Sequence, residues 1–327
     1  MKRIPVPLVI LGLLVLAALL ALASLTVGRV FVPVSVWFDP ADPRGAIIFG
    51  LRAPRAVLGL LVGAALGMSG AAMQGYTRNP LADPGVLGVS AMAALGAVLT
   101  LYFGQAAQAP WVLPLAAMVG AIGGVAMLLG LSGAGSSIVT FILAGVILNT
   151  VAGAGVALAL TLAPNPWAVS QIIDWLMGSL ADRSINDVQI AAPLILGGGA
   201  ILLVTARALD ALTLGETGAR SLGIDLGRTR LLLAIGVGLA TGASVAATGV
   251  VGFVGLVVPH LLRPFVGGRP GALLIPSALG GAVLTVAADI LVRLTPAANE
   301  VKLGVAMAAL GGPFFLALLL GLRRRIA

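Results

Sequence analysis

The chain has 327 residues, of which 60% are hydrophobic and only 9% are charged, and its mean hydropathy is +1.14. Soluble domains carry about 25% charged residues, so this composition excludes a soluble globular protein and predicts an all-α polytopic membrane protein. The absence of cysteine excludes disulfides and thiolate metal sites, and the net charge of +8 lacks the basic block interleaved with aromatic residues that would indicate a nucleic-acid partner.

A membrane-spanning helix needs about 20 mainly apolar residues, and the sequence predicts ten such spans. In chain order they are Pro7–Gly28, Ile48–Met73, Val86–Gly104, Trp111–Leu131, Ile138–Leu162, Val188–Ala208, Leu231–Thr248, Val250–Phe265, Leu273–Leu294 and Leu303–Leu322. A further segment, Ala168–Leu180, is too polar to span and is expected at the membrane surface or as a re-entrant piece.

The first apolar run follows Lys2-Arg3 and is therefore similar to a signal peptide. It is longer than the usual signal core of about 7–15 residues, so we expect a retained first span. With the N-terminus inside, the whole net charge of +8 falls on the inner side of the ten spans. The positive-inside rule therefore predicts that both termini are cytoplasmic.

A polar turn separates the second and third spans: Arg78-Asn79-Pro80-Leu81-Ala82-Asp83-Pro84. Proline at both ends of Leu-Ala-Asp prevents a continuous helix, and the charge distribution places this turn at the inner face.

The longest polar interval, residues 209–230, lies on the same side. Glu216 and Arg220 are four residues apart, in the order that favours a helical ion pair. Leu214, Leu222 and the flanking glycines predict two short helices across the membrane face. By itself this segment fits either a solvated connector or a docking element for a cytoplasmic partner.

Five motifs in register run from the second span to the C-terminus. They are Gly70-Ala71-Ala72-Met73-Gln74-Gly75-Tyr76-Thr77 with the polar turn and Leu87-Gly88-Val89-Ser90; Gly215-Glu216 with Ala219-Arg220-Ser221-Leu222-Gly223; Gly249 through His260; Ala288-Asp289 with Arg293; and Gly311-Gly312-Pro313-Phe314-Phe315. Together they resemble the permeases of ABC importers for iron–siderophores, haem and cobalamin. Met92, Ile185 and the segment Glu300–Gly304 depart from the family's common pattern.

This resemblance implies one transmembrane permease domain over residues 1–327, multi-pass in the bacterial inner membrane, with short cytoplasmic coupling helices. Expected partners are two ATP-binding subunits inside, one periplasmic binding protein outside, the lipid bilayer and a second copy of the chain in a homodimer. No enzymatic activity and no cofactor are expected, because the chain lacks the Gly-x-x-x-x-Gly-Lys-Ser/Thr loop that binds ATP phosphates. The expected cargo is a metal chelate, with ferric siderophore first and haem or cobalamin next.

The resemblance also implies roles for particular residues. The residues expected to dock the binding protein are Arg52, Arg55 and Arg293. Those expected to couple to the ATPase are Leu214, Gly215, Glu216, Arg220, Ser221 and Gly223. Those expected to form the inner-face loop are Arg78, Asn79, Pro80 and Asp83. The arginines could instead be interfacial anchors, and Arg293 could pair with Asp289 one turn earlier. Asn149 and Gln74 either line the pathway or bond between helices, and His260 alone does not make a metal site.

The alternative function is a secondary transporter or channel driven by an ion gradient. Such a protein needs ionisable groups inside the membrane, and Asp289 is the only candidate. Gly59, Gly63 and Gly67 fall on one helical face, which favours close packing within one subunit over a dimer seam.

Overall fold

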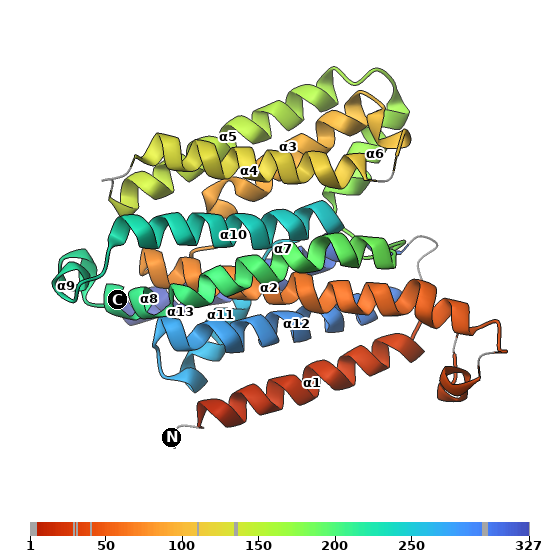
Figure 1. The fold of residues 1–327 in the computed structure, drawn as a ribbon, viewed down its shortest axis with the longest axis horizontal. Helices are drawn as coiled ribbons and strands as arrows, with labels where there is room; N and C mark the ends of the chain where they lie inside the picture. Colours follow the sequence, from red (N-terminus) through yellow and green to blue (C-terminus); the bar gives the residue numbers. More distant parts are fainter. Residues whose placement is uncertain are drawn as a thin grey trace.

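A computed structural model describes residues 5–28, 30, 32–39, 41–109, 111–133, 137–295 and 300–326. Every regular element in these ranges is helical, which confirms the predicted all-α class (Figure 1). Lys2 and Arg3, which bear on the signal-peptide question, lie outside the described residues.

Seven of the described helices are long and apolar enough to cross a membrane, judged by length and composition. They are α1 (Val6–Thr26), α2 (Ala53–Thr77) together with the π-helical turn η2 (Ile47–Arg52), α4 (Val112–Ser132), α5 (Ile138–Thr161), α7 (Ile185–Val204), α10 (Leu226–Thr248) and α12 (Pro270–Leu294). Three further helices coincide with the other predicted spans: the shorter α3 (Val89–Tyr102) and α11 (Val254–Val266), and α13 (Leu303–Ile326), whose apolar part is Leu303–Leu318.

Shorter elements connect the spans. The polar interval forms two short helices, α8 (Ala206–Leu212) and α9 (Gly215–Ser221), as predicted. The segment judged too polar to span contains α6 (Pro166–Leu176), which begins where Asn165 caps it by accepting a hydrogen bond from Ala168 N–H at 2.9 Å. Single 3-10 turns are η1 (Val34–Phe38), η3 (Pro84–Leu87) and η4 (Gln105–Ala107).

The helices are arranged in layers (Figure 1). One layer contains α3, α4 and α5; the middle contains α10, α7 and α2; the other side contains α12, α11 and α1. The most apolar 18-residue windows of α2 and α10 are each 78% buried, whereas that of α1 is 6% buried. Within the middle layer, α2 and α10 are therefore the core of the bundle, and α1 presents its apolar surface outward.

The glycine face of α2 packs against α12. A Cβ added at Gly63 would overlap the backbone carbonyl of Gly281, and one at Gly67 would overlap that of Ser277. At Gly59 it would meet Val286 Cγ2 at 3.2 Å. The three glycines thus let two helix backbones meet inside one chain, as favoured from the sequence over a dimer seam.

Two helices, α3 and α11, begin only after irregular backbone that penetrates the bundle. A Cβ at Gly255 would lie 2.6 Å from Pro84 Cδ and 2.9 Å from Leu66 O, so Pro84 packs beside Leu66. Leu66 precedes the end of α2 by eleven residues, or about 16 Å. That is half of the roughly 30 Å hydrocarbon core, where irregular backbone is tolerated only when it is buried or lines a cavity.

Candidate functional site

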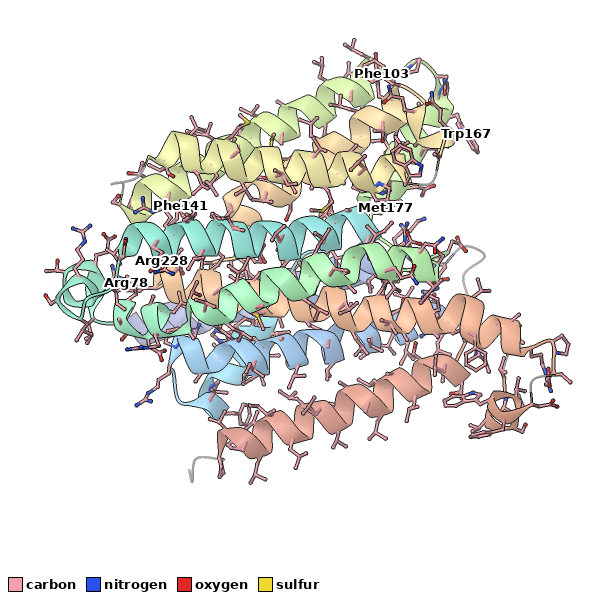
Figure 2. The ribbon with its side chains drawn as sticks, viewed as in Figure 1. Arg78, Phe103, Phe141, Trp167, Met177 and Arg228 are labelled. Atoms are coloured by element: carbon pink, nitrogen blue, oxygen red, sulfur yellow. The ribbon has the colours of Figure 1, made fainter. Side chains whose placement is uncertain are left out.

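The predicted functional residues lie at three levels of the bundle. One group lies at the end that carries α9, hereafter the α9 end; a second lies at mid-depth; and the third lies at the opposite end. Figure 2 shows Arg78 and Arg228 at the α9 end.

At the opposite end, Arg55 and Arg293 share one buried carboxylate. Arg55 Nη2 lies 2.8 Å from Asp289 Oδ1, and Arg293 Nε lies 3.2 Å from Asp289 Oδ2. Asp289 is 2% exposed. Arg55 also forms an ion pair with Glu300. The pairing of Arg293 with Asp289 one helical turn earlier was one of the sequence-based alternatives, and the structure contains it.

Arg52 and Arg293 also bind the C-terminal end of α1. Arg52 Nη1 donates to Leu25 O at 3.0 Å and to Thr26 O at 2.8 Å. Arg293 Nη1 donates to Ser24 O at 3.0 Å. The last carbonyls of a helix have no partner within the helix and carry partial negative charge, so two guanidinium groups stabilise them directly.

All three arginines predicted to dock a binding protein therefore have partners within the chain. Arg52 and Arg293 are each 7% exposed. The cavity of about 310 Å³ at this end is lined by Arg52, Arg55, Arg293, Glu300, Asp182 and neighbouring apolar residues. The sequence analysis did not single out Glu300 or Ser24 as functional partners, because Glu300 is 245 positions from Arg55 and Ser24 is 269 positions from Arg293.

At mid-depth, Asp83 and Asn149 line one cavity of about 490 Å³, together with Ser90 and Val250. Asp83 Oδ1 accepts a hydrogen bond from Gly85 N–H at 2.8 Å and so caps η3. Gly88 follows in a left-handed conformation, with φ of 74°, and a Cβ there would lie 2.9 Å from Asn149 N. Only glycine combines this backbone conformation with such a close approach to α5.

The structure separates residues that the sequence grouped. Arg78 ends α2 in a left-handed conformation and is exposed at the α9 end, whereas Asp83 lies at the mid-depth cavity. Asn79, also exposed, accepts a hydrogen bond from Leu81 N–H at 3.0 Å, and Pro80 follows it. The turn thus runs from the α9 end into the bundle.

Gln74 does not share the cavity of Asn149. Its side chain is 3% exposed, and its Nε2 donates to Gly255 O and Leu256 O at 3.3 Å each. Of the two roles left open for Gln74, bonding between helices is the one that the structure contains.

At the α9 end, Glu216 contacts two elements. It lies 4.0 Å from Arg220 in the predicted ion pair, and its Oε1 accepts a hydrogen bond from Ile138 N–H at 3.3 Å. Ile138 is the first residue of α5, whose cap Ser137 accepts a second hydrogen bond from Thr140 N–H at 3.2 Å. A carboxylate suits this position because the N-terminus of a helix carries partial positive charge.

The other residues predicted to couple to the ATPase lie in or beside α9. Leu214 and Leu222 flank the helix and are 67% and 61% exposed. Gly215 and Gly223 have φ of 85° and 78°, so the chain bends at both ends where glycine is favoured. Ser221 Oγ donates to Thr217 O within the helix. The segment therefore presents two exposed leucines on a short helix of defined bounds.

Arg230 is a buried residue to which the sequence analysis gave no individual role. Its Nε donates to Tyr76 Oη and its Nη1 to Gly133 O, each at 3.1 Å. The Tyr76 ring meets Phe141 edge-on, with 5.6 Å between centroids. This cluster joins α2, α4, α5 and α10 beside α9. Its signal in the sequence is an arginine within the first turns of an otherwise apolar helix.

His260 packs edge-on against Phe314, with ring centroids 5.9 Å apart. In the part of the chain that the structure describes, no three histidine, aspartate or glutamate side chains come together as metal ligands.

Comparisons with known proteins agree with this architecture. The model of the FecCD transport family matches residues 13–321. The chain is 38% identical to the hemin transport system permease protein HmuU of Yersinia pestis, over 98% of this chain and 97% of that protein. It is also 38% identical to the vitamin B12 import system permease protein BtuC of Shigella boydii serotype 18, over 96% and 95% of the two chains.

One solved structure superposes with a TM-score of 0.87 and 32% identity, covering 96% of this chain and 99% of the other. It is described as an inward-facing conformation of an ABC transporter assigned to the metal-chelate type.

Proposed function

The chain belongs to the FecCD transport family, and from that premise we propose that it is the transmembrane permease subunit of an ABC importer for a metal chelate. The match over residues 13–321 is the observation that carries this proposal. Residues 1–327 act as one permease unit, and the chain contributes no ATP hydrolysis because it has no phosphate-binding loop.

In the proposed orientation the α9 end faces the cytoplasm of a bacterium and the opposite end faces the periplasm. The positive-inside rule supports this choice. Arginines exposed at the α9 end include Arg78, Arg207, Arg220, Arg228 and Arg269. Both termini are then cytoplasmic.

Two copies of the chain pair so that the transport path lies between them. Asn149 supports this arrangement, because it is a polar residue exposed on α5 in the single chain. The mid-depth cavity that it shares with Asp83 becomes part of the path. A wide path with few charges suits a large chelate that must leave as readily as it enters.

Two ATP-binding subunits dock on α8 and α9. The hydrogen bond from Ile138 N–H to Glu216 supports a direct link from this surface to the path, because Ile138 begins the helix that carries Asn149. Movement of α9 on ATP binding therefore shifts α5, and access to the path changes sides.

A periplasmic binding protein docks at the opposite end, on the cavity lined by Arg52, Arg55 and Arg293. Because these arginines already bind groups of this chain, carboxylates of the binding protein must exchange with internal partners. Glu300 is the partner best placed to leave, since its side chain is 28% exposed whereas that of Asp289 is 2% exposed. Arg55 is therefore the arginine through which docking is best tested.

Within the metal chelates, the sequence ranks ferric siderophore first, with haem and cobalamin next. The relatives named for hemin and vitamin B12 support haem and cobalamin as cargo. The three differ in charge and size, so an uptake panel separates them.

The test is uptake into proteoliposomes that contain this chain, its ATP-binding subunits and its binding protein, with ferric siderophore, hemin and cobalamin supplied in turn. We expect one chelate to accumulate only when ATP and the binding protein are both present. Uptake by this chain alone, driven by an ion gradient, would instead identify a secondary transporter. Against that alternative, Asp289, the candidate carrier from the sequence, is already paired with two arginines, and the mid-depth carboxylate of Asp83 caps η3 at Gly85 N–H.

A further inference from the structure

A second arginine-lined cavity, besides the one at the opposite end, lies at the α9 end. Its volume is about 260 Å³. Its walls are the last turns of α2, the end of α11, the start of α12 and the turn between α8 and α9. The residues that matter here are Gln74, Arg78, Thr213 and Arg263.

One of the two arginines in this cavity is held in a fixed position. Arg263 Nη2 donates to Gln74 Oε1 at 2.6 Å. Gln74 is itself fixed, because its Nε2 donates to the carbonyls of Gly255 and Leu256. This chain of hydrogen bonds orders the guanidinium group before any ligand arrives, so little further side-chain entropy is lost on binding.

The positive charge in the cavity has no counterpart in the lining. The lining residues include Arg78 and Arg263 and no carboxylate. Among the described residues, neither arginine lies within ion-pair distance of an acidic side chain. The nearby carboxylate of Asp210 instead accepts a hydrogen bond from Gly271 N–H at 2.8 Å. The cavity therefore fits an anion, and the planar guanidinium groups match a carboxylate or a phosphate.

The cavity is continuous with the surface assigned above to the ATP-binding subunit. Thr213 joins α8 to α9, and Arg78 Nη1 lies 3.7 Å from the position of a Cβ added at Gly215, the first residue of α9. We propose that the cavity receives an acidic side chain of the ATP-binding subunit, which fixes that subunit beside the coupling helices. This inference rests on the proposed function.

The experiment measures the affinity of the purified ATP-binding subunit for the purified full-length chain in detergent. Arg78→Glu and Arg263→Glu should each weaken binding by about tenfold or more at low salt, because each places a carboxylate opposite the incoming one. Arg228→Glu is the matched control, since Arg228 is exposed at the same end and does not line the cavity. It should change the affinity by no more than about twofold.

If Arg263→Glu fails to fold, Arg78→Glu still decides the test. We expect that variant to fold, because the Arg78 side chain is exposed and forms no ion pair with a described residue. Wild-type affinity in Arg78→Glu would overturn the proposal. So would an unchanged affinity accompanied by loss of co-purified phosphatidylglycerol, which would identify a lipid headgroup site. If the wild-type chain did not bind the subunit at all, the proposed function would fail, and this inference with it.

Discussion

The carboxylate of Glu216 on α9 accepts a hydrogen bond, 3.3 Å long, from the backbone N–H of Ile138, the first residue of α5. The two residues are 78 positions apart in the chain. Glu216 thus stands between an exposed short helix and a membrane-spanning helix that lines the mid-depth cavity through Asn149. This contact gives a physical route between the proposed ATPase surface and the proposed transport path.

Replacing Glu216 with alanine should uncouple ATP hydrolysis from transport. The variant removes the acceptor at the N-terminus of α5, so α9 can move without moving α5. We expect ATPase activity of the assembled transporter to persist while chelate uptake per ATP falls severalfold. Asp187→Ala is the control: it likewise removes a carboxylate from the first turn of a membrane-spanning helix, α7, where Asp187 accepts a hydrogen bond from Ser184 N–H at 2.8 Å, and it should leave the ratio unchanged.

The absence of cysteine allows a direct probe of the same link. Asn149→Cys gives the protein a single thiol on α5, whose reaction rate with a soluble maleimide reports its accessibility. The rate should change on ATP binding in the otherwise unaltered protein and stay constant when Glu216→Ala is added. Equal changes in both backgrounds would show that α9 does not act on α5 through Glu216.

Neutralising Asp289 should destabilise the opposite end of the bundle. Asp289→Asn leaves Arg55 with Glu300 alone and Arg293 without its carboxylate, and breaking a buried ion pair from one side costs about 3–5 kcal/mol. The melting temperature of the detergent-solubilised protein should fall clearly. Asp42→Asn removes a carboxylate from an exposed ion pair with Arg44, and should leave the melting temperature unaltered.

The α2–α12 seam should not tolerate one added methyl group. Gly63→Ala places a Cβ against the Gly281 carbonyl, so the backbones must separate, at a cost of about 1–3 kcal/mol. Gly123→Ala is the matched change within another helix, where a Cβ would meet nothing within 4 Å. By helix propensity it should be neutral or stabilise by up to about 1 kcal/mol. Thermal unfolding of the two variants tests the contrast, and equal destabilisation would contradict the packing argument.

At Asp83, the acceptor oxygen should matter more than the charge. Asp83→Ala removes the cap of η3 at Gly85 N–H, whereas Asp83→Asn keeps an acceptor in the same place. We expect alanine to lower the yield of folded protein and the chelate uptake, with asparagine close to wild type in both. If asparagine lost uptake as fully as alanine while folding normally, the carboxylate charge would itself be required in the path.

The sequence was sufficient for the positions of the helices. Hydropathy alone predicts all ten apolar helices, because a membrane requires long apolar runs whose backbone is satisfied internally. Turn chemistry in the Arg78–Pro84 segment and the Glu216–Arg220 spacing predict the interruption after α2 and the two short helices. Boundaries were less accurate: the predicted spans began three and four residues before α3 and α11 do, and five residues after α10 does.

The partners of the arginines could not be predicted to the same extent. Helical spacing predicts the Arg293–Asp289 pair, but the bonds from Arg52 and Arg293 to α1 and from Arg55 to Glu300 join residues 26 to 269 positions apart. Likewise, Asp83 belongs with Asn149 only because η3 packs halfway along α5.

Sequence by itself determined that this chain is a polytopic helical membrane protein of a recognisable family, because composition, hydropathy and short motifs are local properties. Only the tertiary structure decided which charged groups are free. It pairs Arg55 and Arg293 with one buried carboxylate, uses Glu216 to cap α5, and leaves Arg78 and Arg263 facing a cavity without a counter-charge. Such assignments depend on distances between helices, since the energy of a charge in a membrane protein is set by what packs against it.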